Sequence, residues 1–268
     1  TEELMVVDLD SQAGSLPAQP TDMELLHDAL VMGVRDYLGK CGFKSAVIGL
    51  SGGIDSAVTA AITLKALGAE NLRGISMPSQ YSSAGSLDDS KSLADNLGIQ
   101  YDVISIRDGF EMMKGSLEPI FKGRSEDVTE ENMQARLRGL IMMAASNKFG
   151  SLVLTTGNKS ELAVGYCTLY GDMCGGYSVL KDVYKTTVFG LSRWRNEYCP
   201  DGALGHRGPV IPERIITKPP SAELKPDQKD QDTLPPYDQL DAILVCLNEK
   251  DMGVDATVEE GYDRPLVL

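Results

Sequence analysis

Short apolar runs alternate with longer amphipathic stretches through the first two thirds of the chain. From 25 to 38, apolar residues recur every three or four positions, which predicts a helix that Thr21 and Glu24 cap and that Gly39 ends. The run 45–50 is apolar and ends in glycines, which is typical of a buried strand in a parallel sheet. The residues 54–67 that follow are apolar on most of a helical surface. The first elements expected are therefore a helix, a strand and a second helix.

The same alternation continues along the chain. Further strands are expected at 72–77, 99–106 and 151–155, and further helices at 85–97, 109–121, 129–149, 183–196 and 237–249. Strands that alternate with helices form parallel sheets covered on both faces, so the expected fold is α/β, an open parallel sheet with helices on both faces. In such sheets a ligand binds at the carboxyl ends of the strands. The stretch 165–182 has no clear period, and the proline-rich stretch 199–236 is expected to be a long loop.

A loop rich in glycine and serine separates the strand 45–50 from the helix 54–67. It reads Ser51-Gly52-Gly53-Ile54-Asp55-Ser56. Its glycines let the backbone approach an anion, and the helix that follows offers free N–H groups and the positive end of its dipole. Asp55 would repel a phosphate unless a cation lies between them, so it is a candidate Mg²⁺ ligand. The alternative is a plain Ser/Gly turn with Asp55 in the first helical turn, where acidic residues are favoured anyway.

Composition restricts the classes of protein that fit these elements. The 268 residues are enough for one large domain, and a formal net charge of −14 argues against a nucleic-acid partner. No apolar run approaches the ~20 residues of a membrane helix, so no membrane partner is expected. The five cysteines form no Cys-x-x-Cys pair, which favours reduced thiols and a cytoplasmic location. Because the chain starts at Thr1 and not at methionine, we expect a fragment of a longer protein.

The hexapeptide loop resembles that of the PP-loop ATP pyrophosphatases, which cleave ATP between its α and β phosphates to adenylate a substrate. Four further segments resemble NAD synthetase in particular. They are Glu131-Asn132-Met133-Gln134-Ala135-Arg136-Leu137-Arg138; Thr155-Thr156-Gly157-Asn158-Lys159-Ser160-Glu161, followed by Leu169-Tyr170-Gly171-Asp172; Leu180-Lys181-Asp182-Val183-Tyr184-Lys185-Thr186; and Ile211-Pro212-Glu213-Arg214-Ile215-Ile216-Thr217-Lys218-Pro219-Pro220-Ser221-Ala222-Glu223-Leu224, continuing to Pro235-Pro236-Tyr237-Asp238. Together with the loop, the similar segments extend over nearly the whole chain. The resemblance implies an adenine nucleotide alpha hydrolase-like fold of the PP-loop type.

The similar segments are closest to the synthetase domain of glutamine-dependent NAD synthetases. The residues 1–20 are expected to be a linker or the remnant of the amidase domain that precedes the synthetase there. The residues 21–268 would form the synthetase domain, with a mobile loop at about 199–236, for which a disordered linker is the alternative. The resemblance also implies a glutamine amidase domain outside this chain and a homodimer. The apolar helix 129–149 is the candidate interface.

What the resemblance implies chemically is a ligase that forms AMP. The nicotinate carboxylate of deamido-NAD would attack the α-phosphate of ATP and expel pyrophosphate, and ammonia would then attack the acyl-adenylate to give NAD. Mg²⁺ would bridge the phosphates and stabilise the leaving pyrophosphate. The rest of the catalysis would consist of positioning and charge neutralisation.

The resemblance also assigns roles to individual residues. The residues expected at ATP are Leu50, Ser51, Gly52, Gly53, Ile54, Asp55, Ser56, Thr156, Lys185 and Ser221. Those expected at deamido-NAD are Asn132, Arg136, Glu161, Lys181 and Asp182. The expected metal ligands are Asp55 and Glu161. The expected catalytic residues are Asp55, Lys185 and Ser221.

Several of these assignments have a simpler structural alternative. Glu161 could be a solvated glutamate at a helix start, and Thr156 could be an N-cap. Arg136 could pair on the surface with the glutamates a turn earlier in its helix. Lys185 opens a helix, where a cation is unfavourable for the dipole, so a phosphate partner explains it better.

Other functions stay open at this point. Another PP-loop amide ligase, such as a GMP synthetase-like or tRNA-modifying enzyme, would share the hexapeptide, although a tRNA enzyme should carry a basic face. A relic that has lost its activity would share it too. A non-catalytic protein that binds adenine nucleotides would have a similar fold, but it gives no reason for Asp55, Glu161 and Lys185 to converge. The distances among these three side chains therefore test the ligase hypothesis against the binding protein.

Overall fold

The computed structural model describes residues 20–198 and 208–268, and its centre is a five-stranded parallel sheet. The strands are β1 (Ala46–Gly49), β2 (Leu72–Ser76), β3 (Gln100–Val103), β4 (Leu152–Thr155) and β5 (Tyr177–Ser178). They lie in the order β3-β2-β1-β4-β5. The direction of winding reverses between β1 and β4, and such a switch point leaves a crevice at the carboxyl ends of the strands.

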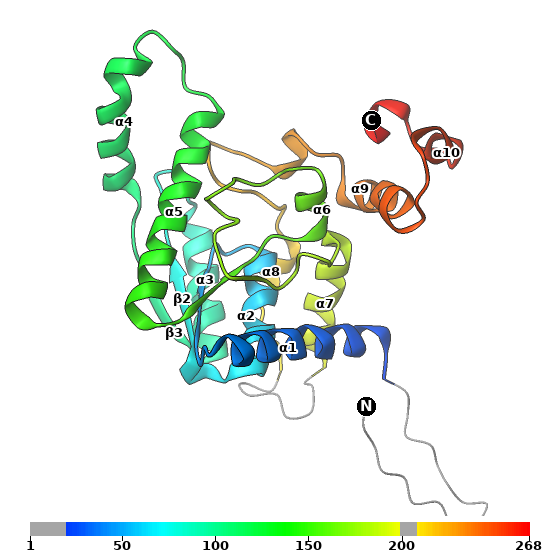
Figure 1. Cartoon of the computed structure of the whole chain (residues 1–268). Coiled ribbons are helices and arrows are strands. Elements are labelled where there is room, and N and C mark those ends of the chain that lie inside the picture. The colour runs from blue at the N-terminus through cyan, green and yellow to red at the C-terminus, as the bar shows by residue number, and fades with distance from the viewer. Residues whose placement is uncertain (1–19, 199–207) are drawn as a thin grey trace, which may run out of the picture.

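Helices connect the strands and cover both faces of the sheet (Figure 1). The longer ones are α1 (Asp22–Cys41), α2 (Ile54–Leu67), α3 (Ala84–Leu97), α4 (Arg107–Phe121), α5 (Val128–Phe149), α7 (Lys185–Glu197) and α9 (Tyr237–Leu244). The shorter ones are α6 (Lys159–Ala163), α8 (Glu213–Thr217), α10 (Val254–Glu259) and α11 (Arg264–Val267). In Figure 1 the α4–α5 hairpin stands on the opposite side of the molecule from α10 and the C-terminus. The open parallel sheet that the sequence predicts is confirmed.

The central strand β1 contributes to two separate cores. Ala46 and Ile48 belong to the larger core, which α1, α2, α3 and α7 build with one face of the sheet. Val47, between them, packs on the other face with Met142 of α5 and Val153 of β4. Successive side chains of a strand point to opposite faces, so a strand covered on both sides has no polar face. This explains the continuous apolar run that predicted β1.

Most helix and strand boundaries lie within a few residues of the predicted ones. Thr21 caps α1 as expected, because its hydroxyl oxygen accepts a hydrogen bond from the N–H of Glu24 at 3.3 Å. The predicted helix end at Gly39 is wrong, since α1 continues to Cys41 and Gly42 ends it with a φ of 79°. A glycine inside a helix costs only about 1 kcal/mol relative to alanine, which the packing of α1 against the core outweighs.

Three regions differ in detail from the sequence pattern. β5 is too short for a period to reveal it, so 165–182 gave no prediction. The helix expected at 237–249 is α9 followed by a π-helical turn, Val245–Glu249. The described part of the expected loop, 208–236, contains α8 and the 3₁₀ turn Asp230–Asp232. The residues 1–19 and 199–207 lie outside the described residues, so the amidase remnant and the mobility of the loop stay predictions.

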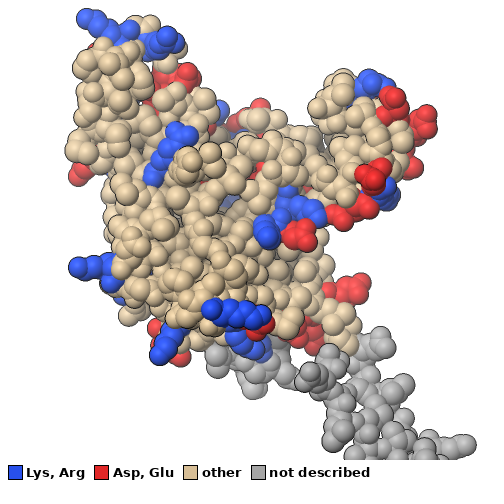
Figure 2. Space-filling model, viewed as in Figure 1, with Lys and Arg blue, Asp and Glu red and all other residues tan. Residues whose placement is uncertain are grey.

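The described surface gives two further observations. Among residues 20–198 and 208–268, no helix is both long and apolar enough to cross a bilayer. On the face shown in Figure 2, Lys and Arg side chains lie dispersed, and many have Asp or Glu nearby. This face carries no broad field of one charge sign.

Candidate active site

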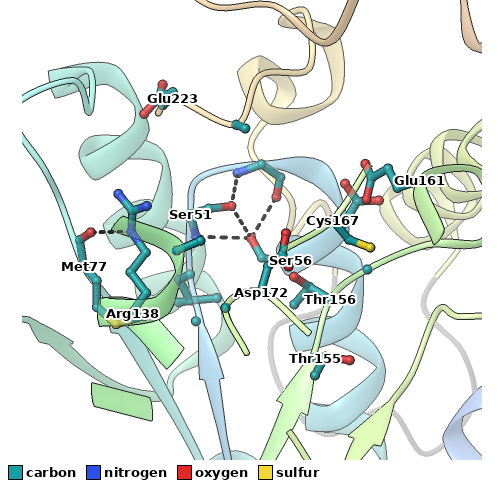
Figure 3. A pocket seen from close by; sticks show the side chains of 18 of the residues that line it. Ser51, Ser56, Met77, Arg138, Thr155, Thr156, Glu161, Cys167, Asp172 and Glu223 are labelled. Atoms are coloured by element: carbon teal, nitrogen blue, oxygen red, sulfur yellow. Dashed lines mark hydrogen bonds between the residues drawn. The ribbon is translucent and has the colours of Figure 1, made fainter. Parts of the chain in front are cut away.

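A cavity of about 560 Å³ opens at the switch point, beyond the carboxyl ends of β1 and β4. Its walls come from the loops after these two strands, from α5 and from the proline-rich stretch after α8. In Figure 3, Ser51 and Ser56 lie between Arg138 on one side and Glu161 on the other, with Glu223 above them. A cavity of this size accommodates a nucleotide-sized ligand.

Serine hydroxyls shape the loop that follows β1. Ser56 Oγ donates to the carbonyl oxygen of Gly53 at 2.9 Å, and the N–H of Gly53 donates to Ser51 Oγ at 3.1 Å (Figure 3). The two hydroxyl oxygens lie 3.2 Å apart. Gly53 is the N-cap of α2 and offers no side-chain hydrogen bond to its first turn. The N–H groups at the start of α2 are therefore suited to bind an anion.

The position of this loop is fixed by α3 and β2. Gly52 has a φ of 77°, and a Cβ atom there would lie 2.4 Å from the carbonyl oxygen of Ser86. The carbonyl oxygen of Leu50 accepts hydrogen bonds from Ser76 Oγ at 2.6 Å and Ser90 Oγ at 3.2 Å. Only glycine combines this backbone conformation with this close approach. These constraints fix the backbone of the loop beside the cavity, and its role in binding a ligand stays a prediction.

Three charged side chains that are distant in the sequence meet beside this loop. Lys185 Nζ lies 2.5 Å from Asp55 Oδ2 and 2.9 Å from Glu161 Oε1. The Lys185 side chain is 2% exposed, and each carboxylate side chain is 17% exposed. The alternative of a solvated Glu161 is therefore wrong. The expected convergence of the three groups is confirmed, and buried charges of this kind are retained only when they are paired.

The three groups shift one another's proton affinity. Burial and the negative charge of Asp55 raise the pKa of Glu161 to about 7, and they outweigh the opposing effect of Lys185. Burial alone would lower the pKa of Lys185, but the two carboxylates raise it above its usual value, so the amine stays protonated. The site thus holds one fixed cation and one carboxyl group that titrates near neutral pH. Such perturbed pKa values are frequent at catalytic sites.

Asn158 joins the two loops that carry the carboxylates. It is fully buried, its Nδ2 donates to Asp55 Oδ1 at 3.0 Å, and its Oδ1 accepts the N–H of Glu161 at 3.1 Å. Asn158 is thereby the N-cap of α6, so the N-cap alternative for Thr156 is wrong, and Thr156 lines the cavity instead. An asparagine before a short helix is an N-cap signal, and this signal could have identified Asn158 from the sequence.

Most residues that the sequence assigns to ligands line the cavity. They are Leu50, Ser51, Gly53, Ile54, Asp55, Ser56, Thr156, Glu161, Lys181, Lys185 and Ser221. Gly52 does not line it and supports the loop from behind. The contacts of these residues with a ligand stay predictions.

Three residues expected at deamido-NAD lie outside the cavity lining. Asn132 Oδ1 accepts a hydrogen bond from a threonine hydroxyl in the stretch 165–182. Arg136 Nε donates to the carbonyl oxygen of Leu169 at 3.2 Å, and the alternative ion pair with a glutamate of its own helix is not formed in the described structure. Asp182 pairs with Lys159 at 2.7 Å. Asn132 and Arg136 thus hold 165–182 against α5, and a direct role in binding stays a prediction for all three.

Arg138 ends one of the segments that carry the resemblance, and it is the principal cavity residue for which no role was predicted. Its Nε donates to the carbonyl oxygen of Met77 at 3.0 Å, and Figure 3 shows the rest of the guanidinium beside the cavity. Burial lowers its pKa to about 10, which still leaves it charged at neutral pH. On a helix, Arg138 shares a face with the buried residues Ala135 and Met142, and this spacing could have revealed it.

The residues 218–236, here called the closing segment, form one side of the cavity. The carboxylate of Glu223 accepts hydrogen bonds from the N-terminal turn of α3, including one from Ser86 Oγ at 2.6 Å. The carbonyl oxygen of Leu224 accepts a hydrogen bond from Gln134 Nε2 on α5 at 2.8 Å. The segment is thus held to two helices by side chains rather than by a strand ladder.

Two polar residues of the closing segment fix its own conformation and its approach to α9. Ser221 Oγ donates to the carbonyl oxygen of Gln228 at 2.5 Å, so this hydroxyl closes a turn of the segment. Asp230 is 3% exposed and accepts a hydrogen bond from the hydroxyl of Tyr237 at 2.8 Å. Burial raises the pKa of Asp230 above its usual range, against the effect of the Tyr237 hydrogen bond. The segment therefore brings a further carboxyl group next to Lys185 and Glu161.

Asp55 and Glu161 form a donor set that fits a magnesium ion. Their oxygen atoms already lie around one positive charge, that of Lys185 Nζ. Mg²⁺ at nucleotide sites takes one or two carboxylates together with phosphate oxygens and water. Among the described residues, no group of three or more His, Cys, Asp and Glu side chains could hold a metal by itself. The pair is thus suited to Mg²⁺ that arrives with a nucleotide.

Comparison with known proteins agrees with this geometry. The family model described as NAD synthase matches residues 26–267. The glutamine-dependent NAD(+) synthetase of Rhodobacter capsulatus is 51% identical over 273 residues, which cover 99% of this chain and 50% of that protein. The chain spans about half the length of the curated relatives that it matches.

Solved structures with the same fold include two informative neighbours. Glutamine-dependent NAD+ synthetase from Acinetobacter baumannii, in complex with ADP, is 44% identical with a TM-score of 0.72, covering 97% of this chain and 46% of that chain. NMN synthetase from Francisella tularensis is 28% identical with a TM-score of 0.75, covering 90% of this chain and 91% of that chain. Because the family model matches nearly the whole chain and a relative is about half identical across it, this chain belongs to the NAD synthase family.

Proposed function

We propose that this chain is the synthetase domain of a glutamine-dependent NAD synthetase, which forms NAD and AMP from deamido-NAD, ATP and ammonia. The observation that carries the proposal is the meeting of Lys185, Asp55 and Glu161 beside the loop 51–56, in a chain of this family. A protein that only bound an adenine nucleotide would have no need for two buried carboxylates around one amine.

The chain's own residues supply the binding and the charge neutralisation for this reaction. The loop 51–56 and the start of α2 would hold the pyrophosphate part of ATP. Lys185 would neutralise the charge that develops as the nicotinate carboxylate attacks the α-phosphorus and the bond to the β-phosphate breaks. Ammonia would then attack the acyl carbon and expel AMP. We propose Thr156 and Ser221 as further ATP contacts, in keeping with their place in the cavity lining.

Mg²⁺ bound by Asp55, Glu161 and the phosphates would add positive charge at the leaving pyrophosphate. Both carboxylates must be deprotonated to hold it, and the pKa of Glu161 is about 7. The affinity of the site for Mg²⁺ should therefore rise as pH rises through 7. Lys185 would then exchange part of its contact with the carboxylates for contact with a phosphate.

The substrate deamido-NAD would enter the same cavity from the side of α5 and the stretch 165–182. Lys181 lines the cavity there. We propose that Asn132, Arg136 and Asp182 act on it from just outside the lining seen here. Ammonia is proposed to come from a glutamine amidase domain outside this chain, in keeping with the greater length and the names of the curated relatives. The cysteine pattern and these substrates support action in the cytoplasm.

We propose that the domain works as a homodimer through α4 and α5. An apolar groove runs between these helices, lined by Met113, Leu117, Met133, Arg136, Leu137 and Leu140. Leu140 is 66% exposed, and Ile120 at the end of α4 is 73% exposed. Exposed apolar surface of this kind favours a partner surface. A mass that stays monomeric at all concentrations in light scattering would contradict the dimer.

The proposed reaction is tested by mixing the chain with MgATP, deamido-NAD and ammonium and separating the products by chromatography. NAD and AMP in equal amounts are expected. Asp55→Asn should lower kcat/KM by ~10²–10³-fold or more, while the exposed Asp36→Asn should not change it. Formation of ADP, or turnover of xanthosine monophosphate instead, would refute the proposal.

A second candidate follows from the structural neighbour named NMN synthetase, which this chain covers almost completely. In that case the acceptor would be nicotinate mononucleotide, which lacks the adenylyl half of deamido-NAD. Parallel assays with the two acceptors decide between them. A higher kcat/KM for the mononucleotide than for deamido-NAD would favour this second candidate over the proposed function.

A further inference from the structure

We propose that Asp241 is a positioning residue, whose buried carboxylate fixes the two elements that present Lys185 and Glu161. Asp241 lies on α9, is 4% exposed and does not line the cavity. It therefore cannot act on a ligand directly. Its contacts show that it acts through its neighbours, and the inference about catalysis rests on the function proposed above.

The first contact is with the start of α7. The Oδ2 atom of Asp241 accepts a hydrogen bond from the N–H of Thr186 at 2.8 Å and another from its hydroxyl at 2.7 Å. Tyr184, the N-cap of α7, makes no side-chain capping bond of its own. The carboxylate from α9 thus supplies the cap and lies at the positive end of the helix dipole. Lys185 precedes Thr186, so this cap fixes the base of the lysine side chain.

The second contact is with α6, which carries Glu161. The hydroxyl of Ser160 donates a short hydrogen bond to Asp241 Oδ1. The same oxygen of Ser160 accepts the backbone N–H of Lys185 at 2.8 Å. Ser160 is fully buried and directly precedes Glu161. One carboxylate therefore holds the backbones of both charged residues in a single hydrogen-bond chain.

This arrangement needs a group that only accepts hydrogen bonds. Asp241 accepts three, from the Ser160 hydroxyl and from the N–H and hydroxyl of Thr186. An ionised carboxylate can accept them all, whereas asparagine would turn an N–H₂ group toward one of these donors. The start of α7 or of α6 would have to shift to relieve that contact. A misplacement of about 1 Å at a reacting group can cost ~10²-fold in rate.

The same face of α9 reaches the site at a second point. Tyr237 lies one turn before Asp241, its ring centroid is 5.1 Å from Lys185 Nζ, and its hydroxyl donates to Asp230 of the closing segment. Residues spaced by one helical turn share a face. α9 thus links the closing segment to α7, which carries Lys185, and to α6, which carries Glu161, and Asp241 makes the contacts with both helices.

Asp241→Asn tests the proposal, with two controls on α9. Asp238→Asn makes the same change at an exposed position. Leu244→Ala removes packing from the cluster of Tyr237, Leu240 and Leu244 but takes away no hydrogen-bond acceptor. We expect Asp241→Asn to lower kcat by ~10- to 100-fold with a smaller change in KM for ATP. Leu244→Ala should lower the midpoint of urea unfolding at least as much as Asp241→Asn does, and should leave kcat within about threefold of the wild-type value.

Hydrogen exchange gives a readout that does not depend on activity. The N–H groups of Lys185 and Thr186 should exchange faster in Asp241→Asn and in Ser160→Ala than in Asp238→Asn, because each variant removes an acceptor at the start of α7. If Asp241→Asn does not fold, Ser160→Ala carries the same test. Equal kcat and equal exchange in Asp241→Asn and Asp238→Asn would overturn the proposal.

The same design separates this proposal from the proposed function. If the wild-type chain makes no NAD, the function is wrong, and calorimetric binding of MgATP together with the exchange rates still decides the role of Asp241. Weaker MgATP binding and faster exchange in Asp241→Asn would support positioning in that case. Unchanged values for both would reject it.

Discussion

The two sides of the cavity are held in place by different means. The loops after β1 and β4 leave the ends of paired parallel strands, so the sheet fixes where they begin, and the side chains of Ser51, Ser56 and Asn158 fix their course. The closing segment 218–236 has no strand partner and is held by single side chains. Its Glu223 binds the start of α3, and Gln134 of α5 binds its backbone at Leu224. The strand-end side thus rests on the pairing of the sheet, whereas the closing segment depends on contacts that single substitutions can remove.

The same contrast appears in the electrostatics of the two sides. The strand-end side holds a fixed cation, Lys185, between two carboxylates. The closing segment adds Asp230, whose pKa burial raises. Changes on the strand-end side should therefore affect folding and chemistry together, and changes in the closing segment should affect mainly the binding of ATP. The following predictions test that difference, from the largest expected effect to the smallest.

Lys185→Met should have the largest effect, because it leaves two buried carboxylates without their cation. We expect the free energy of unfolding to fall by ~3–5 kcal/mol and kcat/KM to fall by ~10³-fold or more. Added Mg²⁺ alone should restore part of the stability, since it would replace the lost positive charge. Urea unfolding with and without Mg²⁺ measures both effects. Stability equal to that of the exposed control Lys181→Met would contradict the central role of the buried amine.

Gly52→Ala should disturb the loop 51–56 on the side that packs against α3. The substitution adds a Cβ atom 2.4 Å from the carbonyl oxygen of Ser86 at a φ of 77°. We expect a loss of ~1–3 kcal/mol in the free energy of unfolding and weaker MgATP binding by calorimetry. Gly39→Ala is the matched control, because a Cβ there meets nothing within 4 Å inside α1, and it should be neutral or stabilising. Equal stabilities of the two variants would argue against a constrained loop.

Glu161→Gln should change how stability depends on pH. The raised pKa means that the folded chain keeps a proton between pH 4.5 and about 7 that the unfolded chain releases. The contribution of Glu161 to the free energy of unfolding is therefore complete below pH 4.5 and is lost as pH rises through 7. The free energy of unfolding of the variant should equal that of the wild type near pH 4.5. At pH 8, without added cations, it should be higher than that of the wild type by roughly 1–3 kcal/mol. Urea unfolding at the two pH values, with the exposed Glu260→Gln as control, checks this; a variant less stable than wild type at pH 8 would contradict it.

Glu223→Gln should have the smallest effect, confined to ATP binding. The amide can accept only part of the hydrogen bonds that the carboxylate takes from Ser83 and Ser86. We expect KM for ATP to rise by ~3- to 10-fold, kcat to change little, and the free energy of unfolding to change by less than about 1 kcal/mol. Steady-state kinetics with ATP varied is the measurement. A large loss of kcat with unchanged KM would place Glu223 on the chemical side of the comparison.

The strand-end side was largely predictable from the sequence. A continuous apolar run identifies β1, and the glycines and Asp55 directly after it mark a ligand loop, because both signals are local. The closing segment was not predictable in the same way. Its proline content suggested a loop, but α8 and the partners of Glu223 depend on helices more than a hundred residues away. Arg138 was missed for a related reason, since its importance lies in which face of α5 meets the cavity.

The sequence by itself determined the alternation of strands and helices, the loop 51–56 and the family, since each depends on residues that are close together or on a pattern carried by the whole chain. Only the tertiary structure decided that Lys185 lies between Asp55 and Glu161, that Asn158 links their loops and that Asp241 on α9 holds the start of α7. These are contacts across large sequence distances. They are fixed by how the elements pack around the switch point, which no local pattern encodes.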